Sequence, residues 1–187
     1  EAIVISPNFP DREGAKRVQR SDAAKILSIS LPVGNGAINL DVLKITENGV
    51  TYYLIDDPKG DFFQGLYKDS DGLRGLIEAV LLSHAVFHIA RADHLKLDVI
   101  HANDWQTGLV PVYLKHLYPQ DFTKTVSVFT SHNMAYQGVF NGYLLVDSND
   151  PILKRLTLDR VLEEGVNFQR KQNQTTVQII PDAYNKD

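Results

Sequence analysis

Two short polar segments hold the side chains in this sequence that are best suited to chemistry. The first is the run His101-Ala102-Asn103-Asp104-Trp105, and the second is the run Ser131-His132-Asn133-Met134-Ala135-Tyr136-Gln137-Gly138. Together they provide carboxylate, imidazole and amide groups, which form hydrogen bonds, and aromatic rings with flat apolar faces. None of these groups is a strong nucleophile. A polyhydroxylated ligand such as a sugar needs this mixture.

Each polar segment directly follows a predicted strand. Asp98–Ile100 and Thr125–Thr130 are short β-rich runs. Between them, the residues from Gln106 to His116 carry a helical pattern whose apolar side consists of Leu109, Val112, Tyr113 and Leu117. Two parallel strands joined by a helix form a βαβ unit, and ligands collect beyond the carboxyl ends of such strands. We therefore expect both polar segments to lie at one edge of a sheet and to face one crevice.

The rest of the chain predicts more strands and one long helix. The predicted strands are Ala2–Ser6, Lys25–Leu31, Ala37–Ile45 and Val50–Ile55, the second and third forming a hairpin around Pro32-Val33-Gly34-Asn35-Gly36. Apolar residues at intervals of three and four predict a helix over Asp71–Ala92. Beyond Phe140, the pattern predicts a polar loop over 141–150 and a helix from Pro151 to Glu164.

Composition excludes several classes of protein. The 187 residues include 43% hydrophobic and 22% charged residues, which suits a single soluble globular domain with a sizeable core. The net charge of -4 argues against nucleic acid or an anionic membrane as a partner. The absence of cysteine excludes a disulfide framework and a thiolate metal site. The longest apolar run, Ala79–Ala90, is interrupted by Ser83, His84 and His88, which predicts a buried helix face rather than a membrane span.

The two polar segments also carry a resemblance. HANDWQTGLVPVYLK followed by VFTSHNMAYQGVF resembles the donor-side signature of bacterial glycogen synthases and plastid starch synthases, whose pattern is close to H-x-H-D-W-Q-T-x-L and then H-N-x-x-Y-Q-G-x-F. The run YYLIDDPKGDFFQGLYKDSDGLR is similar to the segment of that family that precedes the first motif. It departs from that segment at Gln64, Gly72 and Gly75, where the family usually has Arg, Asn and Phe. These departures weaken any acceptor-loop role for this region.

The resemblance implies a fold and an extent. The expected fold is α/β, the Rossmann-like N-terminal domain of a GT-B glycosyltransferase, with a largely parallel sheet and a β-hairpin insertion. Residues 1–187 would form one partial domain of this kind. The nucleotide-binding second domain of the family is expected beyond Asp187, so the chain looks truncated and is expected to be inactive alone.

The resemblance also implies a reaction and its site. The reaction is transfer of glucose from ADP-glucose or UDP-glucose to the non-reducing end of an α-1,4-glucan, glycogen or starch, with retention. It uses no metal and no cofactor beyond the nucleotide-sugar substrate, and takes place in bacterial cytoplasm or plastid stroma. Asp104 and His132 match the catalytic positions in the donor-sugar pocket. The matching substrate-binding positions are His101, Trp105, Asn133, Tyr136 and Gln137.

Other interpretations of the same residues remain open. Asp104 could serve only as a helix N-cap, and His132 could be a buried histidine bonded to backbone. Trp105 and Tyr136 could belong to the core. His84 and His88 have a spacing that could clamp a metal, although no third ligand is evident. At the level of the whole chain, the alternatives are a non-catalytic glucan-binding or regulatory protein and an unrelated flavodoxin-like binding module.

Overall fold

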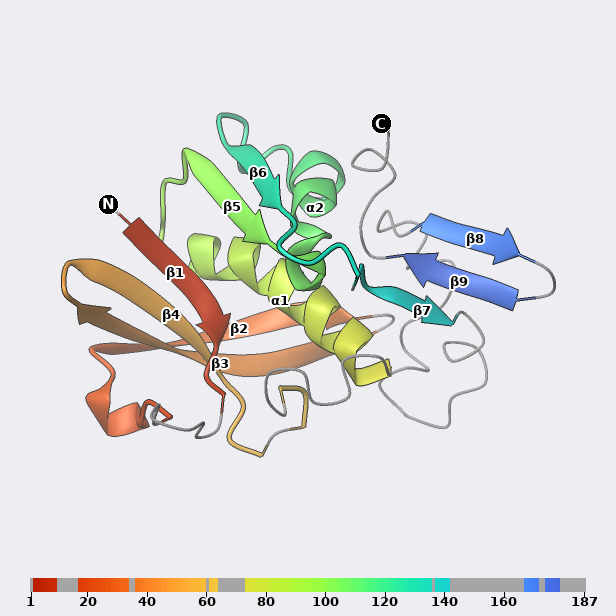
Figure 1. Cartoon of the computed structure of the whole chain (residues 1–187). Coiled ribbons are helices and arrows are strands. Elements are labelled where there is room, and N and C mark those ends of the chain that lie inside the picture. Colours follow the sequence, from red (N-terminus) through yellow and green to blue (C-terminus); the bar gives the residue numbers. More distant parts are fainter. Residues whose placement is uncertain are drawn as a thin grey trace.

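The computed structural model describes residues 2–9, 17–33, 36–59, 61–63, 73–135, 137–141, 167–171 and 174–178. These form, in chain order, β1 (Ala2–Pro7), η1 (Arg20–Asp22), β2 (Lys25–Val33), β3 (Gly36–Glu47), β4 (Val50–Asp56), α1 (Leu73–Ala92), β5 (Val99–Asn103), η2 (Trp105–Thr107), α2 (Val110–His116), β6 (Val126–Thr130), β7 (Val139–Asn141), β8 (Asn167–Lys171) and β9 (Gln174–Gln178). In Figure 1, helix α1 crosses the centre, with β2 and β3 on one side and β5, β6 and α2 on the other.

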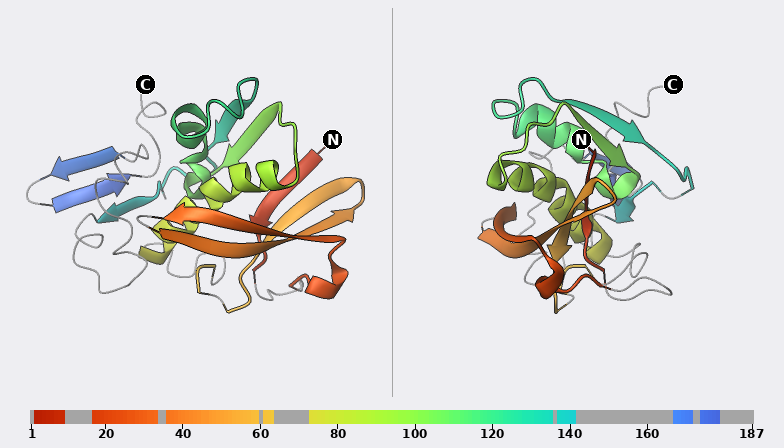
Figure 2. Two further views of the ribbon diagram at one scale, coloured as in Figure 1. Left: turned by 180° about the vertical axis from the view of Figure 1, so that it is seen from behind. Right: turned by 90° about the vertical axis from the view of Figure 1, so that its left-hand side faces the viewer.

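The predicted hairpin is confirmed as the antiparallel pair β2–β3. Every second residue of β2, from Leu27 to Leu31, is buried, whereas Ser28 and Ser30 face solvent. This alternation places one face of the hairpin on α1, because successive side chains of a strand point to opposite faces. The hairpin therefore forms one wall of the core (Figure 2).

A two-residue turn connects β3 to β4. Its residues, Asn48 and Gly49, have φ of 50° and 80°, and the flanking Glu47 and Val50 are paired. Two positive φ angles define a type I′ turn, for which Asn-Gly is the preferred sequence. On its other side β4 pairs in parallel with β1, so the sheet has the order β1-β4-β3-β2.

Helix α1 is the core helix that the sequence predicts. Its apolar stripe is buried, with Leu76, Val80, Leu81 and Phe87 at most 2% exposed. By length and composition the segment Gly75–Ala92 could cross a membrane, but 72% of it is buried inside the protein. The apolar composition of α1 is therefore explained by its burial in the core of the protein.

Asp93 fixes the end of α1 to the hairpin. Its carboxylate, whose side chain is 8% exposed, accepts hydrogen bonds from Lys25, from Lys44 Nζ at 2.7 Å and from the Tyr53 hydroxyl at 2.6 Å. These three donors hold the pKa of Asp93 well below its usual range. Tyr53 has its own pKa raised, mainly by burial.

The strand–helix–strand unit differs from the prediction in its helix. The chain makes the short 3-10 turn η2 and then α2, which starts at Val110 because Pro111 occupies a favourable first-turn position. Leu109, Val110, Tyr113 and Leu114 are buried and Val112 is half-buried, whereas Leu117 is 38% exposed. The prediction for Leu117 was wrong because α2 ends at His116, so Leu117 lies beyond its last turn.

Parallel pairing among the described strands occurs at β1–β4 and β5–β6. The predicted largely parallel sheet is therefore found as two separate parallel pairs, to which the hairpin adds antiparallel strands. Strands β7, β9 and β8 form a third, antiparallel sheet. The helix predicted from Pro151 to Glu164 lies outside the described residues.

Candidate functional site

Strands β5 and β6 bring the two polar segments together. They pair in parallel with Asn103 opposite Thr130, the last residue of each strand. Directly beyond this pair, the Asp104 N–H donates to the Thr130 carbonyl at 2.8 Å. Both arrowheads end side by side in Figure 1. The expectation that both segments share one edge is confirmed, because parallel strands place their carboxyl ends on the same side.

Asp104 and His132 are in direct contact at this edge. The backbone N–H of His132 donates to Asp104 Oδ1 at 2.6 Å. Asp104 is half-buried and His132 is exposed. A backbone donor to a carboxylate is a strong, charge-assisted bond, so it fixes the position of the carboxylate relative to the second segment. The alternative of a buried His132 is excluded by its exposure.

Asn103 orients the His132 ring. Its Oδ1 lies 3.1 Å from His132 Nε2, and its Nδ2 donates to the His101 carbonyl at 3.2 Å. Because the amide oxygen can only accept, Nε2 of His132 is the donor in this arrangement. In the neutral form of the ring, Nδ1 is then an acceptor. Asn103 is a site residue that we did not single out from the sequence.

The backbone of Asp104 is strained. Its φ of 60° and ψ of 174° lie in a region that residues with a Cβ rarely occupy, and such a conformation costs about 1–3 kcal/mol. Asp104 holds the N-cap position of η2, but its side chain makes no capping hydrogen bond. The interpretation that Asp104 serves only as a cap is therefore wrong. Its carboxylate instead points to the second polar segment.

Thr107 holds this strained turn in place. Its hydroxyl is 2.8 Å from the Asn103 carbonyl and 3.0 Å from the Asp104 carbonyl, and its N–H donates to the latter at 3.0 Å. These contacts close the turn on the side away from His132. Thr107 belongs to the motif HANDWQT, but nothing in the sequence alone separates its role from that of an ordinary helix residue.

Trp105 lies beneath the site. It is 7% exposed, so its ring belongs to the core. Gly138 of the second segment packs on it: a Cβ at Gly138 would lie 2.8 Å from Trp105 Cε3 and 3.0 Å from its Cβ and Cδ2. Gly138 also has φ of +66°. Both the close approach to Trp105 and the positive φ require glycine at position 138. The contact between Gly138 and Trp105 therefore links the two polar segments.

The remaining predicted site residues shape or flank this edge. His101 is exposed, and its Nε2 lies 2.8 Å from Thr130 Oγ1. Asn133 Oδ1 accepts the Ala135 N–H at 2.9 Å, and Gln137 Nε2 donates to the Met134 carbonyl at 2.9 Å. In this structure, the side chains of Asn133 and Gln137 therefore order their own loop. Tyr136 lies outside the described residues.

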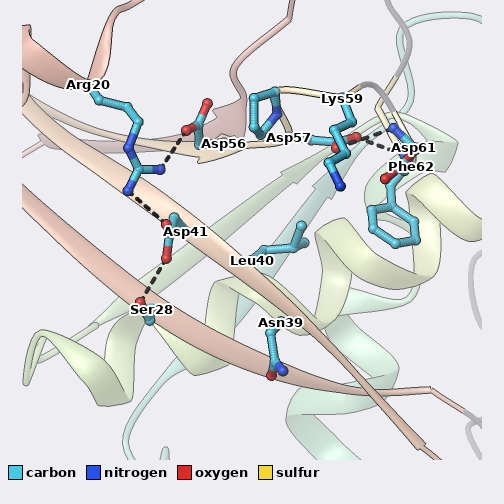
Figure 3. A pocket seen from close by; sticks show the side chains of 11 residues that line it. Arg20, Ser28, Asn39, Leu40, Asp41, Asp56, Asp57, Lys59, Asp61 and Phe62 are labelled. Carbon is cyan, nitrogen blue, oxygen red and sulfur yellow. Dashed lines mark hydrogen bonds and ion pairs between the residues drawn. The ribbon is translucent and has the colours of Figure 1, made fainter.

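Away from the two polar segments, a hollow of about 330 Å3 lies beside the loop that follows β4 (Figure 3). Arg20 joins Asp41 at 2.8 Å and Asp56 at 3.0 Å across it. The pKa of Asp41 is lowered by the hydrogen bond from Ser28 and by that from Arg20. Asp57 accepts the N–H groups of Asp61, Phe62 and Phe63 at 3.2, 2.7 and 2.8 Å. These carboxylates are thus occupied in ordering the loop and the hairpin.

His84 and His88 share a tyrosine rather than form an open pair. His84 Nδ1 and His88 Nε2 lie 2.8 and 3.1 Å from the Tyr118 hydroxyl. His84 also stacks on Tyr113, with the ring centroids 4.3 Å apart. Burial, with the nearby charges of His84 and Arg91, lowers the pKa of His88 to about 4. Within the described part of the chain, no three His, Cys, Asp or Glu side chains are grouped so that they could hold a metal ion.

The sequence matches one protein family over nearly its whole length. The family described as "Starch synthase catalytic domain" matches residues 1–180. The chain belongs to this family. Membership accounts for the two motifs at the ends of β5 and β6, which lie within the matched region.

Curated relatives of the family are bacterial glycogen synthases. The glycogen synthase of Thermosipho africanus is 40% identical over 146 residues, which is 75% of this chain and 30% of that protein. The glycogen synthase of Exiguobacterium sibiricum is 30% identical over 178 residues, 91% of this chain and 35% of that protein. The chain therefore spans about a third of the length of these two relatives.

A solved structure supports the fold assignment. The catalytic domain of Starch Synthase IV from Arabidopsis thaliana, bound to ADP and acarbose, matches with a TM-score of 0.59 and 16% identity. The match covers 94% of this chain and 41% of that one. The chain thus has the α/β, Rossmann-like fold of a starch synthase GT-B catalytic domain.

Proposed function

We propose that this chain forms part of a glucosyltransferase of the glycogen and starch synthase type. The reaction transfers glucose from ADP-glucose or UDP-glucose to the non-reducing end of an α-1,4-glucan, with retention. Residues 1–187 supply part of the N-terminal domain, and a nucleotide-binding domain supplies the other side of the cleft. The protein works in bacterial cytoplasm or plastid stroma. Family membership and the side-chain chemistry of the two polar segments support this proposal.

The observation that carries the proposal is the fixed pair of Asp104 and His132. The 2.6 Å bond from the His132 N–H holds the Asp104 carboxylate at the carboxyl edge of parallel strands. In a dry cleft, a carboxylate stabilises the positive charge that develops on a sugar ring during glycosyl transfer. At a separation of about 4 Å and an effective dielectric constant of about 20, this stabilisation is about 4 kcal/mol.

The other residues have supporting roles in this proposal. His132 presents Nδ1 as an acceptor for a sugar hydroxyl, because Asn103 occupies Nε2. His101 and Asn133 are exposed beside it and bind further hydroxyl groups. Gln137 and Tyr136 contribute from the second segment. Trp105 acts through its packing beneath Gly138 rather than as a stacking face, because its ring is buried.

The test is glucosyl transfer in a chimeric enzyme. Residues 1–180 replace the matching region of the Thermosipho africanus glycogen synthase, and incorporation of radiolabelled glucose from ADP-glucose into glycogen is measured. We expect transfer by the chimera, and a fall in kcat of about a thousandfold in Asp104→Asn, because about 4 kcal/mol of charge stabilisation is removed. His132→Ala should lower kcat by at least about a hundredfold.

Val126→Thr is the matched control, because Val126 is 57% exposed at the opposite end of β6 from the site. Its activity should equal that of the parent chimera. Near-parental kcat in both site variants would refute the assignment of Asp104 and His132. A folded chimera that binds maltoheptaose but transfers no glucose would instead favour the non-catalytic glucan-binding protein.

A further inference from the structure

Two consecutive residues at the end of β5 hold the same histidine. Asn103 Oδ1 lies 3.1 Å from His132 Nε2, and Asp104 Oδ1 accepts the His132 backbone N–H at 2.6 Å. Neighbouring side chains therefore fix the ring and the main chain of His132 at separate points. We call this arrangement of Asn103 and Asp104 the two-point clamp.

The backbone conformation of Asp104 makes the two-point clamp possible. Successive side chains of an extended strand point to opposite faces, so Asn103 and a following residue in regular β conformation would diverge. Asp104 has φ of 60° and ψ of 174° instead. This conformation interrupts the alternation and brings the carboxylate to the residue that Asn103 contacts. The clamp thus explains the strain of Asp104, because strained residues persist where the surrounding structure fixes them.

Thr107 holds the main chain of both clamp residues. Its hydroxyl lies 2.8 Å from the Asn103 carbonyl oxygen and 3.0 Å from that of Asp104. On the other side, the Asp104 N–H donates to the Thr130 carbonyl of β6 at 2.8 Å. The clamp is thus fixed between the turn that follows it and the strand that leads to His132. Removal of the Thr107 hydroxyl should loosen both points of the clamp.

The main chain of β5 determines how the Asn103 amide is oriented. Its Nδ2 donates to the His101 carbonyl at 3.2 Å. A carbonyl oxygen can only accept, so the amide nitrogen faces His101 and Oδ1 faces the ring of His132. Nε2 of the ring is therefore used within the protein, and Nδ1 is left for a ligand. In the neutral ring, Nδ1 can bind only a ligand group that donates, such as a hydroxyl.

We propose that Asn103 and Thr107 are positioning residues for the candidate site. They act through the two-point clamp, which makes Asp104 and His132 move as one unit. The Asp104 carboxylate and His132 Nδ1 then keep a constant separation while a glycosyl group reacts. Fixed polar groups stabilise developing charge better than mobile ones, because they need no reorganisation. This inference rests on the proposed glucosyl transfer, since it assigns residues that serve that reaction.

The first test is NMR of the 187-residue chain, which needs no transfer activity. The nitrogen chemical shifts of the His132 ring report the contact with Asn103, and the proton shift of the His132 amide reports the bond to Asp104. Asn103→Leu has a similar shape but no acceptor. It should move the two ring shifts toward each other at about pH 8.5, where an ordinary histidine ring is neutral, and should leave the amide shift in place. Thr107→Val should change both signals.

The second test is kinetic and uses the chimeric enzyme. Asn103→Leu and Thr107→Val should each lower kcat for glucosyl transfer about tenfold, because each removes a hydrogen bond that holds the reacting groups. KM for the nucleotide sugar should change by less than about twofold, since the positioned groups act mainly in the transition state. Thr107→Ser restores the hydroxyl and should recover most of the lost kcat. Val126→Thr, at the far end of β6, is again the control.

Three results would overturn the proposal. Unchanged ring shifts in Asn103→Leu would show that the amide does not hold the ring. A parental kcat in Thr107→Val, together with a lower urea midpoint, would show that Thr107 serves stability alone. A kcat of Thr107→Ser as low as that of Thr107→Val would show that the loss does not come from the hydroxyl. A parent chimera that transfers no glucose would instead refute the proposed function, whereas the NMR shifts would still confirm or refute the two-point clamp.

Discussion

Replacing Gly138 by alanine tests how the second polar segment is held above Trp105. The new Cβ would lie 2.8 Å from Trp105 Cε3, and Gly138 has φ of +66°. Adopting a left-handed conformation costs a residue with a Cβ about 1–2 kcal/mol, and overpacking against a fixed core group costs about 1–3 kcal/mol more. The ring cannot move away freely, because it is buried. We expect Gly138→Ala to lower the free energy of unfolding by about 2–5 kcal/mol.

Gly49→Ala is the matched control for this experiment. Gly49 has φ of +80°, but nothing lies within 4 Å of the Cβ that alanine would add. It should therefore show only the backbone penalty, about 1–2 kcal/mol. The difference between the two variants, measured by urea denaturation, isolates the contact with Trp105. In a Trp105→Ala background, followed by circular dichroism, the cost of Gly138→Ala should fall toward that of Gly49→Ala, because the contacts with Cε3 and Cδ2 are removed and only the 3.0 Å contact with the Cβ of residue 105 stays.

Fluorescence adds a local readout, because Trp105 is the single tryptophan of the chain. Displacement of the second segment in Gly138→Ala should expose the ring and shift its emission to longer wavelength, whereas Gly49→Ala should leave the emission unchanged. Equal losses of stability in the two glycine variants, with the same emission maximum, would refute the packing of Gly138 on Trp105.

Three further predictions concern the contacts that position the site and the core. Thr107→Val should lower the free energy of unfolding by about 1 kcal/mol, since it removes the hydroxyl that binds the Asn103 and Asp104 carbonyls. Thr123→Val, at an exposed position, is the control. Equal urea midpoints for the two variants would contradict the role of the Thr107 hydroxyl in holding the turn. Asp93→Asn should cost about 1–3 kcal/mol at pH 7. The pKa of Asp93 is lower in the folded state than in the unfolded state, so its contribution to the free energy of unfolding is present above about pH 4 and is lost as the pH falls below that value. An equal loss of stability in Asp93→Asn at pH 7 and at pH 2 would contradict this prediction. Tyr118→Phe should leave the NMR-measured pKa of His88 near its value of about 4, since burial is the largest cause of the shift; a rise to about 6.5 would show that the hydroxyl controls it. Because the pKa of His88 is lower in the folded protein than in the unfolded chain, the unfolded chain binds more protons than the folded protein below pH 6.5. The contribution of His88 to stability is therefore lost as the pH falls from about 6.5 to about 4.

Local patterns in the sequence predicted most of the framework. Period-two alternation located the β2–β3 hairpin, and the three-four spacing located α1, because both periodicities reflect which face of an element is buried. The Asn48-Gly49 signal was also present in the sequence and would have predicted the β3–β4 turn. Two polar segments after successive strands were enough to predict that they meet, since parallel strands end at one edge.

The predictions that failed depend on where an element ends and on contacts between distant residues, which local patterns do not specify. Helix α2 ends at His116, which leaves Leu117 at the surface. Asp104 lies where a cap is expected, yet its carboxylate binds the His132 N–H, a group 28 positions away in the chain. Only the folded chain brings these groups together.

The sequence by itself determined the α/β class, the family and the two segments that carry the candidate site, because motif residues and hydrophobic periodicity are properties of adjacent positions. The tertiary structure alone decided what each side chain does there. It buried Trp105 beneath Gly138, placed Asn103 on the His132 ring, and strained the backbone of Asp104. The physical reason is that contacts between distant segments depend on how layers pack, and packing is set by the whole core at once.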